Sequence, residues 1–264
     1  MRSPAIVSLT FDDGLRCQFE KALPILDRHG IPATFFLIAN QEQTHDRWSG
    51  HTDDWWKIDW REGDIAMLRE LTQKGHEIGS HSVTHDPTKM PMQPDIEAGE
   101  SKRLIETWLG TKVSSFCYPF YRSHAYLLKT VKSAGYEQAR GGGPPPQYDA
   151  RASYYKTSRS SQLDLFNVHC RLISRNEDVS QWMRPACWHV LNYHAVGDDN
   201  DGWEPISIRQ FSTQIEELAR HRDNNSVEVV TFKQGAERAR LQPASSGTTA
   251  LERFSHCWRN WLRR

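Results

Sequence analysis

This sequence of 264 residues lacks a long apolar run and an excess of charge of either sign. No run approaches the ~18 apolar residues that a membrane-spanning helix needs, so we expect no membrane span. The apolar residues 5–9 are too short for the core of a signal peptide, which favours a cytoplasmic location. Lys and Arg, 33 together, balance 33 Asp and Glu, and this gives no electrostatic reason to expect nucleic acid as a partner.

Cysteine is also scarce. The five cysteines are odd in number and have no paired spacing: Cys17, Cys117, Cys170, Cys187 and Cys257. A disulfide framework is therefore not expected, and reduced thiols agree with a cytoplasmic protein.

Short apolar, β-branched runs alternate with amphipathic patterns along the chain. The alternation predicts a mainly parallel sheet with helical crossovers, an α/β architecture whose active site lies at the carboxyl ends of the strands. We expect one domain over residues 1–240 and a mobile tail over 241–264, because Ser, Gly and Thr are frequent there. The expected strands are 5–9, 33–39, 77–82, 114–118, 136–139, 165–173, 188–195 and 227–232, and the expected helices 18–29, 64–74, 96–109, 124–134 and 208–222.

Two strand ends carry groups suited to a metal. Asp12 and Asp13 follow the first strand, and because adjacent carboxylates repel each other they favour a nearby cation. Asp-Gly is also a common turn, which would explain the pair equally well. His81 and His85 follow the third strand and can converge on one ion if the chain leaves the strand in a helical turn. His76 and Asp86 are the alternative candidates nearby.

A third strand end, Leu-Asn-Tyr-His over residues 191–194, adds His194. A lone histidine there more often serves packing. Together the three strand ends supply two imidazoles and a carboxylate, the ligand set of a catalytic metal site, with a further carboxylate and imidazole beside it.

With these motifs the sequence resembles the polysaccharide deacetylases, carbohydrate esterase family 4, whose shared module is the NodB homology domain. The resemblance covers roughly residues 5–235 and depends on TFDDG at 10–14, HSVTH at 81–85, YPF at 118–120 and LNYH at 191–194. It implies a distorted (β/α) barrel of about seven strands. It also implies hydrolysis of the acetamide of an N-acetylated sugar, releasing acetate and a free amine.

Carried over by position, the resemblance makes Asp12 the general base and His194 the general acid. Asp13, His81 and His85 become the ligands of one divalent ion, zinc in the first place, with cobalt, nickel or manganese as alternatives. The ion would polarise the carbonyl, and a backbone N–H near Phe120 would help to hold the oxyanion, with Tyr121 beside it.

The sequence departs from the family pattern at two points. Cys117 stands where the family has an arginine that orients the base, so we expect Arg140 or Arg159 (with Arg122 as a further candidate) to approach Asp12 instead. The aspartate that usually supports the acid histidine has no clear match, and Asp149 and Asp164 are weak candidates.

An insert over residues 40–61 contains Trp48, Trp55, Trp56 and Trp60. Aromatic faces stack on sugar rings, so Trp55 and Trp56 are candidate substrate contacts, although a self-packed loop would show the same composition. Two other functions stay open. One is hydrolysis of a non-sugar amide, because the fold does not determine the substrate. The other is a non-catalytic module that binds a glycan or metal.

Overall fold

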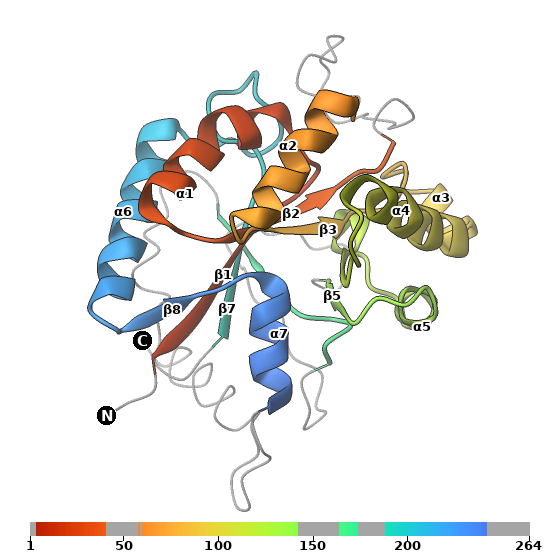
Figure 1. The fold of residues 1–264 in the computed structure, drawn as a ribbon. Coiled ribbons are helices and arrows are strands. Elements are labelled where there is room, and N and C mark those ends of the chain that lie inside the picture. The colour runs from red at the N-terminus through yellow and green to blue at the C-terminus, as the bar shows by residue number, and fades with distance from the viewer. Residues whose placement is uncertain (1–3, 41–57, 59, 142–163, 174–187, 242–264) are drawn as a thin grey trace, which may run out of the picture.

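The computed structural model of the protein describes residues 4–40, 58, 60–141, 164–173 and 188–241. The expected mobile tail lies outside these residues apart from Leu241. The described residues contain a parallel sheet in the order β5-β4-β3-β2-β1-β7-β6, with β8 added beside β1 (Figure 1). Its strands are β1 (Ala5–Phe11), β2 (Ala33–Leu37), β3 (Glu77–Ser80), β4 (Ser115–Cys117), β5 (Gln138–Arg140), β6 (Arg171–Leu172), β7 (Trp188–Tyr193) and β8 (Val227–Val229).

The segment 165–172 closes the sheet into a ring. Its first half pairs with β5, where Ala139 N–H donates to the Leu165 carbonyl (2.7 Å) and Val168 N–H to the Ala139 carbonyl (3.0 Å). Its last two residues form β6, which pairs with β7. Seven parallel strands therefore surround a common interior, which confirms the expected distorted barrel.

Helices cover the outside of this barrel (Figure 1). The expected helices all form, with bounds shifted by a few residues. They are α1 (Leu23–His29), α2 (Glu62–Gln73), α4 (Pro94–Leu109), α5 (Ala125–Ser133) and α6 (Ile208–Asp223). A π-helical segment, η1 (Gln18–Ala22), precedes α1. Pro24 stands in the first turn of α1, where its missing N–H costs no hydrogen bond, so the α-helix proper starts late.

Two further helices were not expected, α3 (Lys89–Met92) and α7 (Phe232–Leu241). The last strand was predicted to extend to residue 232 but ends at Val229. Thr231 and Gln234 exchange hydrogen bonds at the start of α7, where the Gln234 side chain accepts from Thr231 N–H (3.1 Å). Phe232 N–H donates to the Thr34 hydroxyl (2.9 Å). These caps turn an apolar run that reads as strand into a helix start.

The core lies inside the ring and between the sheet and the helices. The Phe11 ring stacks on Phe35 (centroids 5.0 Å apart) and Tyr193 (5.3 Å), and its other neighbour is Phe211 of α6. Aromatic pairs of this kind contribute about 0.5–1.5 kcal/mol beyond their burial. Because Phe11 directly precedes Asp12, this packing fixes the strand end that carries both candidate carboxylates.

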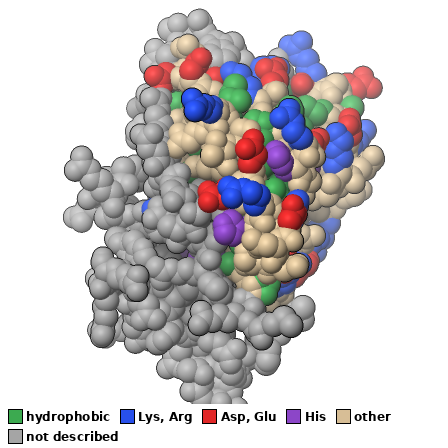
Figure 2. Space-filling view, turned by 90° about the vertical axis from the view of Figure 1, so that its left-hand side faces the viewer, with side chains coloured by type: hydrophobic (Ala, Val, Ile, Leu, Met, Phe, Trp, Pro, Cys, Tyr) green, Lys and Arg blue, Asp and Glu red, His purple; other side chains and the backbone are tan. Residues whose placement is uncertain are grey.

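None of the helices in the described part of the chain is long and apolar enough to cross a membrane. On the face shown in Figure 2, the described basic and acidic side chains are interspersed, and neither sign forms a large patch of its own.

Candidate metal centre and acid–base groups

The side chains of the candidate metal centre come from the ends of two strands. Asp13 follows β1, and its Oδ1 lies 3.4 Å from His81 Nε2 and 3.7 Å from His85 Nε2. One donor atom from each of the three residues lies within 4.8 Å of the others. His81 Nδ1 lies 2.9 Å from the Cys117 carbonyl, an acceptor that places the proton on Nδ1 and leaves Nε2 free to bind a cation.

The two histidines converge by a different route from the expected helical turn. Ser82 and His85 have left-handed backbone conformations, with φ of 70° and 52°. The Ser82 hydroxyl accepts a hydrogen bond from His85 N–H (3.0 Å). The buried Glu97 carboxylate of α4 accepts from Val83 N–H and Thr84 N–H, both at 3.0 Å. A tight loop anchored to α4 therefore brings the imidazoles together.

Backbone strain is concentrated at this end of the barrel. Five of the eight described non-glycine residues with positive φ belong to the candidate site: Asp13, Ser82, His85, Phe120 and Tyr121. Such conformations cost of order 1–3 kcal/mol each and persist only where surrounding contacts impose them. The site is therefore held in place by the fold around it.

Asp12 is the second carboxylate after β1 and is almost fully buried. Both of its oxygens accept hydrogen bonds from Arg140 Nη2, and Oδ2 also accepts from Asn192 Nδ2 (3.0 Å). Burial raises the pKa of Asp12, but the positive charge of Arg140, followed by His81 and His194, lowers this pKa below its usual value overall. The structure thus places an ionised carboxylate beside the candidate metal ligands.

Arg140, at the end of β5, has no exposed surface and is enclosed by sulfur atoms and aromatic rings. Its guanidinium donates to the sulfur atoms of Cys117 and Cys170, each at 2.7 Å. The rings of Phe36 and Tyr121 lie 5.4 and 5.5 Å from its central carbon. Arg140 therefore occupies the position, relative to Asp12, that the sequence left open when Cys117 replaced an arginine.

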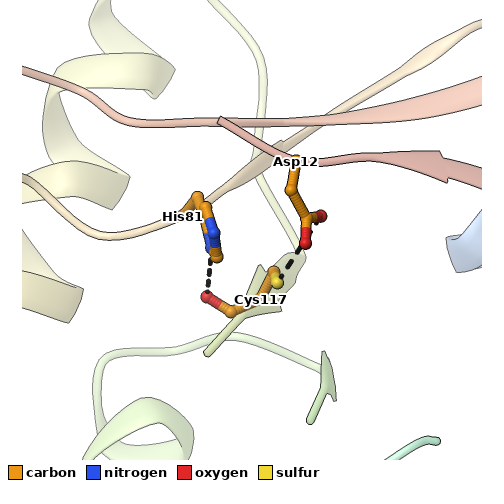
Figure 3. Close-up of side chains that lie close together, drawn as sticks. All are labelled: Asp12, His81 and Cys117. Atoms are coloured by element: carbon orange, nitrogen blue, oxygen red, sulfur yellow. Dashed lines mark hydrogen bonds between the residues drawn. The ribbon is translucent and has the colours of Figure 1, made fainter. Parts of the chain in front are cut away.

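A second ligand set, Asp12, His81 and Cys117, also brings its donor atoms within 4.8 Å of one another (Figure 3). The Cys117 thiol donates to Asp12 Oδ1 across 3.7 Å. Arg140 contacts both the thiol and the carboxylate, so an ion bound here would meet a guanidinium. The set of Asp13, His81 and His85 is the better metal site.

His194 follows β7, and its Nε2 lies 3.6 Å from Asp12 Oδ2. Its Nδ1 is buried and has no hydrogen-bond partner among the described residues. The Trp203 ring stands edge-on to the imidazole at 4.5 Å. Burial is the main reason that the pKa of His194 is lowered. Gln18 Nε2 donates to the Asp12 and His194 carbonyls (2.5 and 3.0 Å) and so ties the two strand ends together.

The loop after β4 forms η4 (Pro119–Tyr121) and borders the candidate metal centre. The Phe120 ring lies 4.4 Å from the His85 ring. The Tyr121 hydroxyl accepts from Asn192 Nδ2 (2.8 Å), and Tyr121 N–H donates to the Tyr118 carbonyl (3.1 Å). Phe120 and Tyr121 therefore border the candidate metal centre, and their contact with substrate stays a prediction.

Other candidates lie elsewhere. His76 directly precedes β3 at the amino ends of the strands, where its Nε2 lies 3.0 Å from Asp27 Oδ1 of α1. Asp86 Oδ1 accepts from Thr88 N–H (2.7 Å). Asp164 Oδ1 accepts from Phe166 N–H instead of supporting His194. Trp60 of the insert is a packing residue whose indole N–H donates to the Ile38 carbonyl (2.8 Å). Trp48, Trp55, Trp56, Asp149 and Arg159 lie outside the described residues.

Residues 2–139 match the family model described as polysaccharide deacetylase. The chain belongs to this family. Over 137 residues it is 27% identical to the putative polysaccharide deacetylase YxkH of Bacillus subtilis, a match that covers 51% of this chain and 44% of that protein. Over 92 residues it is 28% identical to a chitooligosaccharide deacetylase of Sinorhizobium fredii, covering 34% of each chain. Each match therefore spans less than half of the relative's own length.

Solved structures agree with this family's fold. The Xyl-CE4 domain of a multidomain xylanase, from the hindgut metagenome of Trinervitermes trinervoides, superposes with a TM-score of 0.58. The superposition covers 95% of this chain and all of that domain at 17% sequence identity. A structure titled T48 deacetylase with substrate gives a TM-score of 0.53 at 17% identity, over 90% of this chain and 92% of that one.

Proposed function

We propose that the protein is a metal-dependent hydrolase that removes acetyl groups from the nitrogen of amino sugars in a glycan. The observation that supports this most strongly is the juxtaposition of two groups of side chains. The ligand set Asp13, His81 and His85 lies directly beside Asp12, which Arg140 holds, and His194. Metal binding alone would need only the first group.

The residues present suit a divalent ion. Two imidazole nitrogens and one carboxylate oxygen favour zinc, with cobalt, nickel and manganese as alternatives, and leave coordination positions for water and substrate. When bound, the ion would polarise the acetamide carbonyl and lower the pKa of water to about 7. His81 is oriented for this by the Cys117 carbonyl at Nδ1.

Asp12 acts as the general base in this proposal. Its carboxylate takes a proton from the attacking water, which requires that it be ionised and aimed away from the ligand shell. The bonds from Arg140 and Asn192 do both, because they stabilise the anion and fix the plane of the carboxylate.

His194 acts as the general acid. An amine leaves an amide only when it is protonated, and Nε2 of His194, 3.6 Å from Asp12 Oδ2, is the nearby group that can deliver a proton. The backbone N–H of Phe120 is proposed to help hold the oxyanion, and the rings of Phe120 and Tyr121 to contact the substrate. Trp55, Trp56 and Arg159 remain proposals for substrate binding and base orientation from sequence alone.

The two competing functions, a non-catalytic binding module and a hydrolase of non-sugar amides, can be distinguished by turnover and by substrate preference. A binding module without catalysis is favoured by one observation, that His194 Nδ1 has no acceptor among the described residues. A hydrolase of non-sugar amides would use the same groups but release acetate from small acetamides as fast as from oligosaccharides.

The decisive experiment measures acetate release from chitopentaose by the metal-free protein and after addition of each candidate metal. We expect turnover only with metal, and His81→Ala should lose both bound metal and turnover. His221→Ala, which changes a partly exposed histidine on α6 far from the proposed ligands in the sequence, is the matched control and should retain both. Stoichiometric metal in His81→Ala would show the ligand assignment to be wrong, and metal binding without turnover in the unmodified protein would favour the binding module.

A further inference from the structure

Arg122 lies at the border of the candidate site, directly after η4. Its guanidinium carbon is 5.5 Å from the centre of the Phe120 ring, and this ring in turn lies 4.4 Å from that of His85. Arg122 is exposed, so its charge faces solvent, and only the Phe120 ring separates it from the proposed metal ligand His85.

The loop that carries Arg122 is fixed. Arg122 N–H donates to the Pro119 carbonyl and Tyr121 N–H to the Tyr118 carbonyl, both at 3.1 Å. Between them, Phe120 and Tyr121 hold left-handed conformations that direct successive side chains along the site. The Phe120 ring supports the guanidinium through a cation–π contact, which leaves the N–H donors of the guanidinium available.

No carboxylate among the described residues forms an ion pair with Arg122, and the first turn of α5, which follows, has no acidic residue. The contrast with other arginines is clear. Arg140 is bonded to Asp12, and the exposed Arg103 on α4 pairs with Glu100. An arginine held on an aromatic ring without an acidic partner presents a planar fork suited to a carboxylate or phosphate.

We infer that Arg122 binds an oxyanion, a carboxylate or a phosphate, on a sugar unit next to the one that loses its acetyl group. This inference rests on the proposed deacetylase function and narrows its substrate to anionic N-acetylated glycans. The same charge disfavours a neighbouring sugar that is already deacetylated, because its ammonium group would be repelled.

The test compares two tetrasaccharides. One is chitotetraose, and in the other N-acetylglucosamine alternates with glucuronic acid. Calorimetric Kd values and kcat/KM for acetate release are measured for the metal-loaded wild type, Arg122→Gln, Arg122→Lys and the control Arg103→Gln. We expect Arg122→Gln to weaken binding of the uronate tetrasaccharide about fivefold, as for an exposed ion pair, and chitotetraose less than twofold. Arg122→Lys should retain part of the preference, which should also shrink at high salt.

Equal weakening of both tetrasaccharides, or of neither, in a folded Arg122→Gln protein would overturn the inference. The inference would also be overturned if Arg122→Gln, Arg122→Lys and Arg103→Gln all kept the wild-type preference for the uronate tetrasaccharide over chitotetraose. Chitotetraose carrying a single 6-phosphate distinguishes the two oxyanions, since tighter binding than the uronate identifies phosphate. The Kd values do not depend on turnover. Absence of acetate from both substrates therefore tests the proposed deacetylase function separately from the oxyanion site.

Discussion

Each end of the barrel holds a carboxylate away from bulk water, buried in the case of Asp12 and partly buried in the case of Glu77, and the two have different hydrogen-bond partners. Asp12 follows β1 at the carboxyl ends of the strands, whereas Glu77 opens β3 at the amino ends. Asp12 is bonded by a guanidinium. Glu77 is bonded by the hydroxyls of Thr34 (2.9 Å) and Ser115 and by the N–H of Lys233 (2.8 Å).

The same desolvation therefore has opposite outcomes. Burial is the largest influence on the pKa of both groups and raises each. Hydrogen bonds from neutral donors do not offset it at Glu77, whose pKa stays above its usual value, while the charge of Arg140 reverses it at Asp12. Glu77 fastens the start of α7 to the barrel, which is a structural task. Asp12, by contrast, is bonded by the charged guanidinium of Arg140, which keeps this carboxylate ionised.

The largest effect should separate these carboxylates by activity. Asp12→Asn keeps the shape and removes the proton acceptor, so kcat should fall by about 10²–10⁴ while bound metal and fold persist. Glu77→Gln should leave kcat within about twofold, because it touches none of the proposed reacting groups. Acetate release and metal content of both purified variants check this. Near-normal turnover in Asp12→Asn would remove this residue from the mechanism.

The next effect concerns the guanidinium. Arg140→Leu leaves Asp12 buried without its counter-charge, and breaking such a pair typically costs about 3–5 kcal/mol of unfolding free energy. The pKa of Asp12 should rise, so the acidic limb of the pH–rate profile should move to higher pH. Arg140→Lys keeps the charge and should show a smaller shift in this limb.

A double variant sharpens this test. If Arg140 acts through Asp12, then Asp12→Asn combined with Arg140→Leu should lose less stability in urea denaturation than the two single losses added together. Additive losses, or an unmoved acidic limb in Arg140→Leu, would mean that Arg140 supports packing only.

The smallest expected effect is a change in the pH dependence of stability, caused by Glu77 at the amino ends of the strands. Because the pKa of Glu77 is raised in the folded state, the folded protein holds this proton more tightly than the unfolded chain. The stability that this contributes is present below the unfolded pKa of about 4.3 and is lost as pH rises through the folded value. Glu77→Gln removes this loss, so it should gain stability relative to the wild type as pH increases from 4 to 8. The measurement is urea denaturation of both proteins at several pH values. A stability difference that stays constant from pH 4 to 8 would contradict this prediction.

The sequence was sufficient to locate the groups that follow strands. Asp12, His81 and His194 each come directly after an apolar run, and parallel strands that end at one edge bring such residues together. The contact between Arg140 and Asp12 could be predicted because the base needs a positive charge beside it and Cys117 cannot supply one. The prediction followed from what an ionised carboxylate requires, together with the place of Arg140 directly after the expected strand 136–139.

Contacts that depend on register were missed. Asn192 donates to Asp12, and the available signal was that it stands two residues before His194, which places both side chains on one face of an extended chain. Cys170 reaches Arg140 because residues 165–172 pair with β5, and Phe36 reaches it from β2. No periodicity in a single segment contains this information. The left-handed loop between His81 and His85 was likewise hidden, because neither Ser82 nor His85 is glycine.

β1 exchanges backbone hydrogen bonds with three partners, β2, β7 and β8, the last of which is formed by residues 227–229. During synthesis this strand leaves the ribosome before its three partners, and the last of them emerges more than 200 residues later. At about 5–20 residues per second, Asp12 and Asp13 wait roughly 10–45 s for the strands that enclose them. For this interval β1 lacks one of its three partners, so the strand that carries the proposed chemistry is open to non-native pairing until residues 227–229 are made.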